Sequence, residues 1–252
     1  DEPLDTWLKP RHTDGLAVYV SGNATPGQGD VVALAIVDKQ RHGVSKLAAD
    51  LSAEEDAAVK QWLESDAPKY MHEAKAAHHM LRGRGIELAG IAHDTAIAAY
   101  LLRPGQRTYA LEDIYQRHLQ RQLNIGSDQM SLLGDTADVD AAAAILELSA
   151  ELTKELREID SYELYADLEL PLVTVLAEME HTGIAVDLDV LENQRKELTL
   201  KVEQIEEEAR ALVDEPSLNL SSPKQLSAVL FDKLELPKTK KTKTGYSTAA
   251  GE

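Results

Sequence analysis

The chain has 252 residues, of which 43% are hydrophobic and only 4% aromatic, and it carries a formal net charge of −18. It contains no cysteine, which excludes disulfides, thiolate metal sites and cysteine nucleophiles and suits a reducing compartment. No apolar run approaches 18 residues, so we predict no membrane span, and the length allows one large domain or two small ones.

Five segments in the first 94 residues have the composition of β-strands. They are apolar or β-branched and are bounded by Gly, Asn and Pro, and they cover 16–22, 31–37, 42–47, 68–72 and 88–94. The first three follow one another directly, and the later ones alternate with helical segments. This order predicts an α/β layer with a mixed sheet.

Helix caps mark the segments between the later strands. Ser52 with Glu55 three residues on has the capping-box pattern, for a helix that ends near Leu63. A second helix follows the fourth strand. Asp94 or Thr95 can cap a third, which ends before a Pro-Gly pair.

From about Ala110 the signals are helical. Helices are predicted at 111–119, over the Ala-rich segment opened by Asp138 and Asp140, and at 171–181. We place a domain boundary near residue 160, so that the predicted domains cover 1–160 and 161–252.

A long helix is predicted after Asp187, which is its expected N-cap. Its apolar residues repeat every seven positions, with Arg195 as the exception: Leu188, Leu191, Leu198, Val202, Ile205, Ala209 and Leu212. A heptad seam of this kind predicts that the helix packs lengthwise on a partner helix.

The C-terminal segment differs from the rest in charge. From Pro216 onward six lysines face three acidic residues, a net charge of +3, so the first 215 residues carry −21. Ser222, Pro223 and Gln225 have the pattern of an N-cap, a first helical proline and a capping box. A polyanion is therefore repelled by most of the chain and tolerated mainly at this end.

The eight histidines raise the question of a metal site. His72, His78 and His79 lie within eight residues, but their spacing does not match the His-Glu-x-x-His pattern of zinc sites. We therefore predict no metal site and interpret these residues as surface or capping histidines. Phosphate-binding glycine loops and a nucleophile elbow are also missing from the sequence.

Two C-terminal segments, EMEHTGIAVDLDVLENQ and NLSSPKQLSAVLFDKLELPKTKKTKTGYST, closely resemble the bacterial DNA polymerase I family, also called family A. GIELAGIAHDTAIAAYLL is similar, more weakly, to the middle of the family's 3′–5′ exonuclease domain. The resemblance implies a ribonuclease-H-like, 3′–5′ exonuclease-like α/β domain with a mixed sheet. An all-α start of the polymerase domain, including part of the thumb, follows it.

Active exonucleases of this family hold two metal ions with carboxylates, which stabilise the attacking and leaving oxygens. The positions that match those carboxylates are neutral in this sequence: Tyr19, Ser21, Ala77, Ala137 and Ala141. The resemblance therefore implies an exonuclease-like domain without metal ligands and without activity. An active Mg²⁺-dependent 3′–5′ exonuclease that uses shifted carboxylates is the alternative, with Asp94, Asp138 or Asp140 as its ligands.

In this family the palm and fingers, which carry the catalytic aspartates, follow the thumb. The sequence ends inside the segment that resembles the thumb, so we expect no DNA synthesis and no cofactor for this chain alone, with Mg²⁺ needed by the parent polymerase. The expected partners are primer-template duplex DNA and the palm and fingers of the same polymerase, in the cytoplasm at the nucleoid. A third alternative is an acidic protein-interaction module with no role on DNA.

A thumb grips duplex DNA through its sugar–phosphate backbone, which needs cations and short hydrogen-bond donors. The residues that the resemblance assigns to this contact are Asn219, Ser221, Ser222, Lys224, Lys240, Lys241, Lys243, Thr244, Gly245, Ser247 and Thr248. From the residues alone, a solvated lysine-rich loop and ordinary helix capping explain the same pattern.

Overall fold

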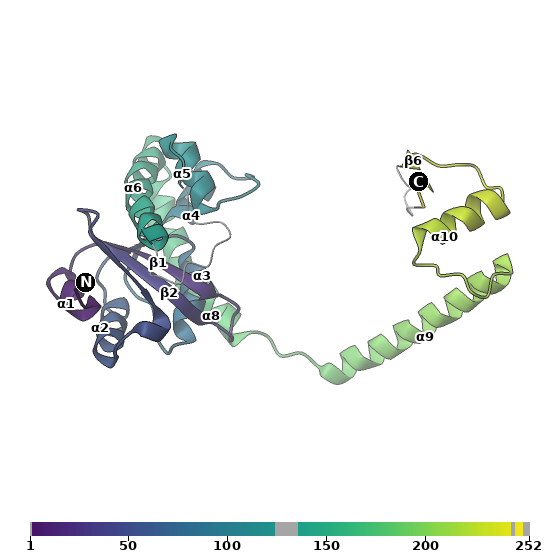
Figure 1. The fold of residues 1–252 in the computed structure, drawn as a ribbon, viewed down its shortest axis with the longest axis horizontal. Coiled ribbons are helices and arrows are strands. Elements are labelled where there is room, and N and C mark those ends of the chain that lie inside the picture. Colours follow the sequence, from purple (N-terminus) through teal and green to yellow (C-terminus); the bar gives the residue numbers. More distant parts are fainter. Residues whose placement is uncertain (1, 124–135, 243–244, 249–252) are drawn as a thin grey trace. The chain divides into compact units, whose positions relative to one another are not determined.

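The structure is a computed structural model that describes residues 2–123, 136–242 and 245–248 (Figure 1). Internal contacts divide the chain into two compact units, Asp1–Gly183 and Ile184–Glu252. The sequence places the boundary near residue 160, whereas the segment after it packs with the first unit. Tyr165 and Val173 lie in the two hydrophobic cores of that unit, which accounts for the difference.

The first unit is built on one five-stranded sheet. Its strands are β1 (Leu16–Asn23), β2 (Asp30–Val37), β3 (Gly43–Leu47), β4 (Lys69–Met71) and β5 (Ile91–Asp94). Their order is β3-β2-β1-β4-β5. The first three strands pair antiparallel, whereas β4 pairs parallel with β1 and β5 parallel with β4. The predicted mixed sheet and its five strands are confirmed.

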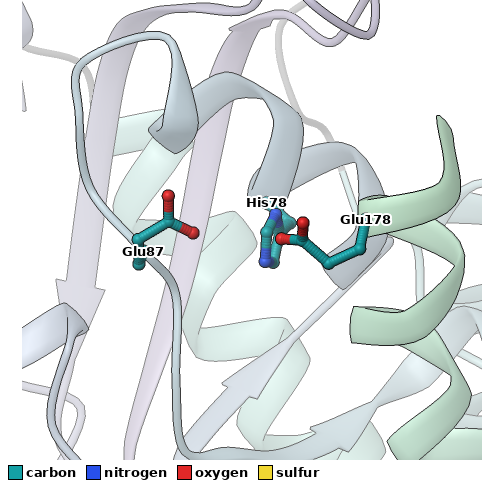
Figure 2. A group of neighbouring side chains, drawn as sticks. All are labelled: His78, Glu87 and Glu178. Atoms are coloured by element: carbon teal, nitrogen blue, oxygen red, sulfur yellow. The ribbon is translucent and has the colours of Figure 1, made fainter. Parts of the chain in front are cut away.

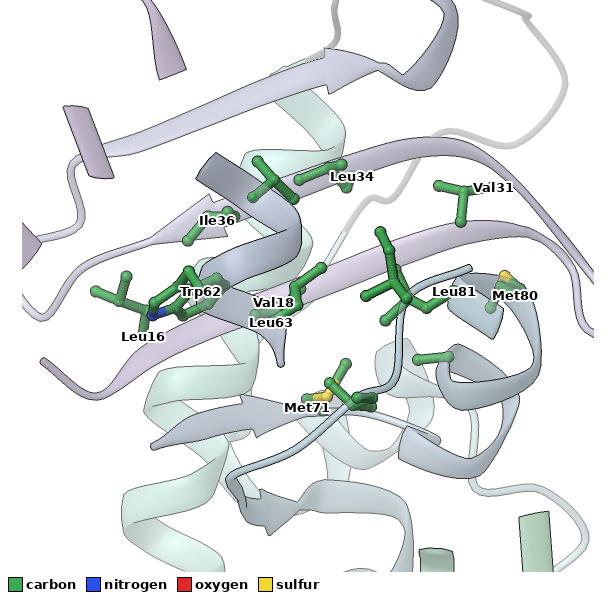
Figure 3. Packing of buried hydrophobic residues seen from close by; sticks show 14 of the residues in the cluster. Leu16, Val18, Val31, Leu34, Ile36, Trp62, Leu63, Met71, Met80 and Leu81 are labelled. Atoms are coloured by element: carbon green, nitrogen blue, oxygen red, sulfur yellow. The ribbon is translucent and has the colours of Figure 1, made fainter. Parts of the chain in front are cut away.

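Side chains alternate between the two faces of this sheet, as the pleat requires. Leu16 and Val18 of β1 point into one core, and Ala17 points into the other. The first core lies under α1 (Leu4–Leu8), α2 (Ala53–Leu63) and α3 (Ala74–Arg82). Figure 3 shows it from close by, with Trp62 of α2 among the side chains of this core.

The second core lies under three further helices: α4 (Thr95–Leu102), α5 (Leu111–Leu119) and α6 (Thr136–Glu158). Small alanines of α6 allow this helix to lie close on the sheet, and 141–144 are all buried. The short η1 (Lys9–Arg11), η2 (Ala48–Asp50) and α7 (Tyr162–Leu164), the π-helical η3 (Tyr165–Glu169) and α8 (Leu170–Thr182) complete the unit. Two sheet faces, each covered by helices, therefore enclose two separate cores.

The second unit begins with α9 (Leu188–Val213), whose N-cap is Asp187 as predicted. The remaining elements are α10 (Pro223–Ser227), the π-helical η4 (Ala228–Lys233), β6 (Lys241–Thr242) and β7 (Gly245–Tyr246). A small core forms around Val213, Leu218 and Val229. No helix that the structure describes is long and apolar enough to cross a membrane.

The heptad seam of α9 is exposed, and its lengthwise packing on a partner helix stays a prediction. Six of its members are at least 50% exposed: Leu188, Leu191, Leu198, Val202, Ile205 and Leu212. Within the described residues of its own unit, only the last turn of α9 joins the small core, through Val213. The pattern thus predicts an apolar face correctly, but the described residues of the unit supply no helix to cover it.

Candidate functional site

The positions that match the family's metal carboxylates are divided between the two cores of the first unit. Tyr19 and Ala141 border the core under α6, with Tyr19 half-buried on β1 and Ala141 fully buried. Ala77 of α3 lies in the other core, on the opposite face of the sheet. Ser21 and Ala137 are half-buried. The five side chains carry no carboxylate.

Several acidic side chains approach Tyr19 instead. A cavity of about 340 Å³ beside it is also lined by His72, Glu73 and Glu112. Burial raises the pKa of the Tyr19 hydroxyl, and the negative charges of Asp138, Glu112 and Glu73 raise it further. Sequence reasoning missed the two glutamates, although Glu73 directly follows a predicted strand. Because phosphate is repelled by such a lining, the cavity does not suit a nucleic-acid backbone.

Asp94 has a structural place at the end of β5. Its carboxylate accepts four backbone N–H groups: 3.3 Å from Glu73, 2.7 Å from Ala74, 2.8 Å from Ala96 and 3.3 Å from Ile97. It therefore caps the start of α3 and the start of α4 at once. Burial raises the pKa of this carboxyl, while the four donors act in the opposite direction. The predicted cap is confirmed, and the oxygens point at backbone donors.

The other shifted carboxylates do not join Asp94. Asp138 accepts a hydrogen bond from the Ser45 hydroxyl at 3.4 Å, and Asp140 is exposed. Among the described residues, the acids near Tyr19 form no group of three metal-binding side chains whose ligand atoms lie within 4.8 Å of one another. The geometry thus gives the alternative exonuclease no ligand set in this part of the chain.

The interpretation of the histidines as surface or capping residues is wrong for two of them. His78 and His79 are buried on α3, because the helix is packed between the sheet and α8. His79 pairs with Glu180 of α8 at 2.7 Å. His72 contacts the Thr95 hydroxyl at 2.9 Å, and burial lowers its pKa to about 4.

The lysine-rich segment forms a small antiparallel hairpin in the second unit. Lys241 pairs with Tyr246 across β6 and β7. Next to the strands, the Ser247 N–H donates to the Lys240 carbonyl at 2.9 Å, and the Thr239 hydroxyl donates to the Ser247 carbonyl at 2.6 Å. Backbone pairing thus fixes the stems from which the lysines project.

Aromatic contacts attach this hairpin to the helical part of the unit. The Tyr246 ring packs edge-on against Phe231 of η4, with ring centroids 5.5 Å apart. The Lys238 ammonium lies 5.1 Å from the centroid of the same tyrosine. Phe231 is buried. Gly245 has φ +147°, a conformation that favours glycine, so the start of β7 requires this residue.

The turn before α10 is organised by its own side chains. The Ser222 hydroxyl accepts the Gln225 N–H at 3.4 Å, which confirms the predicted N-cap. The reciprocal half of the capping box differs from the prediction. Gln225 accepts the Asn219 N–H at 2.9 Å, because the Ser222 N–H already donates to the Asn219 carbonyl. Asn219 also accepts the Ser221 N–H at 2.9 Å.

Most of the residues assigned to DNA contact lie at the surface of the second unit. The exposed ones are Asn219, Ser221, Lys224, Lys240 and Lys241, and the half-buried ones are Ser222, Gly245, Ser247 and Thr248. Lys243 and Thr244 lie outside the described residues. Exposed cations on a hairpin and short donors on a fixed turn have the chemistry that phosphate contacts need.

Comparison with known proteins identifies both units. A family model for the ribonuclease H-like domain of DNA polymerase I matches residues 23–130, and one for DNA polymerase family A matches residues 188–252. The DNA polymerase I of Mycobacterium tuberculosis is 43% identical over 97% of this chain, and that of Bacillus subtilis 40% over 79%.

The chain belongs to the DNA polymerase I family. A solved structure from this family, the polymerase domain of Pol1 from M. smegmatis with DNA primer-template and dNTP, is 43% identical with a TM-score of 0.80. That match covers 99% of this chain and 43% of the other. The chain spans 28% of the length of its M. tuberculosis DNA polymerase I relative.

The first unit has the fold expected of the ribonuclease H-like domain of DNA polymerase I. An apo nuclease with 17% identity matches 71% of this chain and 90% of its own with a TM-score of 0.56, a likeness that concerns the fold alone. The ribonuclease-H-like fold class, the mixed sheet and the family are therefore shown.

Proposed function

We propose that this chain serves DNA synthesis by a bacterial DNA polymerase I in replication and repair. The first unit, residues 1–183, acts as an exonuclease-like scaffold that does not hydrolyse DNA. The second unit, residues 184–252, forms the start of the polymerase domain, including the part of the thumb that holds primer-template duplex DNA. The observation that carries the proposal is 43% identity with a DNA polymerase I over 97% of the chain.

The scaffold role rests on the metal-ligand positions of the first unit. Two metal ions need several carboxylates that converge on one point, and the matching positions here are Tyr, Ser and Ala. The Asp94 carboxylate already accepts four hydrogen bonds from backbone N–H groups. With its cores intact, the unit remains a rigid α/β body that supports the domain after it. The palm and fingers of the same polymerase would be its partners, and Mg²⁺ would act there.

The thumb role rests on the charge and geometry of the second unit. The residues from Pro216 onward carry a net charge of +3 in a chain of −18, and exposed lysines project from the hairpin stems. A hairpin fixed by Tyr246 on Phe231 presents these cations with little loss of backbone freedom. Contacts of this kind bind duplex DNA without reading its sequence.

Fluorescence anisotropy of a labelled primer-template, titrated with the full chain at several salt concentrations, tests this role. Each phosphate contact adds about −0.9 to the slope of log K against log salt. A variant with Lys240→Ala and Lys241→Ala should bind more weakly, with a slope less steep by about two.

A matched control separates a local contact from net charge. Lys39 and Lys154 are exposed lysines of the first unit, and replacing both by alanine removes the same charge. We expect this control to keep the affinity and the slope. If both double variants behave alike, or if neither changes the slope, the hairpin is not the DNA-binding surface.

A further inference from the structure

Three side chains from separate segments of the first unit converge beside α3. His78 lies on α3, Glu87 on the loop that follows it, and Glu178 on α8. Their nearest ligand atoms all lie within 4.8 Å of one another, and no other group of three His, Asp or Glu is this close among the described residues. Figure 2 shows the imidazole between the two glutamates.

The imidazole of His78 is the buried member of the cluster. His78 is 2% exposed, and its Nδ1 is enclosed without a hydrogen-bond partner. The neighbouring His79 differs, because its Nε2 pairs with Glu180. A neutral imidazole carries a lone pair on one ring nitrogen, and this is the form that binds metal ions. The ring lies between two carboxylates, and a buried nitrogen without a hydrogen-bond partner calls for an explanation such as a bound ion.

Arg82 stands beside the same two carboxylates. Its Nε lies 3.3 Å from Glu87 Oε1, and its Nη1 pairs with Glu178 Oε1. Each carboxylate has a second oxygen, so a guanidinium on one oxygen leaves the other for a cation. The glutamate side chains are 59% and 45% exposed and can adjust their rotamers. Arg82 therefore holds the two glutamates in place, and it also competes with a bound metal ion for their negative charge.

We propose that His78, Glu87 and Glu178 form a binding site for a divalent transition-metal cation of the Zn²⁺ type. One imidazole and two carboxylates suit Zn²⁺, with a fourth position for water, whereas Mg²⁺ prefers oxygen ligands alone. Zn–ligand bonds of about 2.0–2.2 Å require the three atoms to close to about 3.5 Å, a movement that the two exposed glutamates supply. Bound metal would link α3, the loop and α8. This site is independent of the thumb and of DNA binding.

Calorimetric titration of the metal-free full chain with Zn²⁺ tests the site, with Co²⁺ absorption as a second readout of ligand geometry. We expect one saturable site and a rise in the melting temperature of the first unit. Glu178→Gln and His78→Phe should each weaken binding by about tenfold or more. Glu178→Gln alters an exposed side chain and should leave the fold intact, which circular dichroism verifies.

Two further variants test whether binding depends on the cluster itself. Glu180→Gln removes a carboxylate from the same helix but outside the cluster, and binding should stay unchanged. Arg82→Gln removes the competing cation, and binding should become tighter. If Zn²⁺ does not bind, or binds the His78 and Glu178 variants as it binds the unaltered chain, the proposal is wrong.

Discussion

Replacement of Asp94 separates a helix cap from a metal ligand. Its carboxylate holds four backbone N–H groups at the starts of α3 and α4, and it is buried. Loss of a cap costs about 1 kcal/mol per helix, and leaving a buried donor such as the Ala74 N–H unpaired adds about 1–3 kcal/mol. We therefore expect Asp94→Ala to lower the free energy of unfolding by about 3–5 kcal/mol.

Asp94→Asn should be intermediate, because the two carboxylate oxygens have different partners. Oδ1 accepts from Glu73, Ala96 and Ile97, whereas Oδ2 accepts from Ala74 at 2.7 Å. Asparagine can keep its oxygen at the position of Oδ1, where it still accepts three N–H groups. Its NH₂ group then faces the Ala74 N–H, so two donors meet there. Hydrogen exchange should therefore show faster exchange at Ala74 and retained protection at Ala96.

Tryptophan fluorescence during urea unfolding measures this effect in the first unit alone. Trp7 and Trp62 are the two tryptophans of the chain, and both are buried in its first core. If Asp94→Ala leaves the unfolding midpoint unchanged but abolishes a Mg²⁺-dependent shortening of DNA, then Asp94 is a metal ligand and our reasoning is refuted.

Three further changes test other parts of the structure. Burial lowers the pKa of His93 from 6.5 to about 3, so only the unfolded chain takes up its proton between those values, and stability falls as the pH falls below 6.5. At pH 5 the loss from His93 is about 2 kcal/mol, and His93→Phe should remove this part of the fall in the free energy of unfolding in urea between pH 7 and 5, while the part from His72 remains. Tyr246→Ala removes the contact with Phe231 and should reduce hydrogen-exchange protection of the Ser247 amide by about tenfold, while the tryptophan signal stays unchanged. Ile205 lies on the exposed seam of α9, so Ile205→Gln should change the free energy of unfolding by less than about 0.5 kcal/mol in circular dichroism melts. A loss of several kcal/mol would mean that another part of the protein covers this face of α9.

Much of the fold could be predicted because its signals are local. Ser52 and Glu55 form the predicted capping box, and Asp187 caps α9 as its position indicates. The five apolar segments become strands of one sheet. Each of these outcomes depends on residues a few positions apart, for which sequence spacing and geometry agree.

The rest depends on partners far apart in the chain. Asp94 can be recognised as a cap for α4, but its second helix begins 20 residues earlier and is brought to it by β4 and β5. The burial of His78 follows from the packing of α8 on α3, about 100 residues away. The heptad pattern of α9 shows that one face is apolar but cannot tell what covers it.

In the candidate sites, too, local features could be predicted from the sequence and contacts between distant segments could not. The residue types at Tyr19, Ser21 and Ala77 could be judged from the resemblance, because a missing carboxylate is visible in the sequence. That Glu73 and Glu112 line the space beside Tyr19 could not, since a turn and a separate helix bring them there. In the second unit the lysines were visible, but the hairpin that presents them depends on Tyr246 and Phe231.

One incubation tests the central claim most directly. The full chain is mixed with a primer-template whose primer carries a 5′ label, in the presence of Mg²⁺ or Mn²⁺, and both binding and primer length are followed. We predict that the duplex is bound and that the primer keeps its full length. Shortening from the 3′ end that disappears in Asp94→Ala or Asp138→Ala, or absence of binding at low salt, would contradict the account.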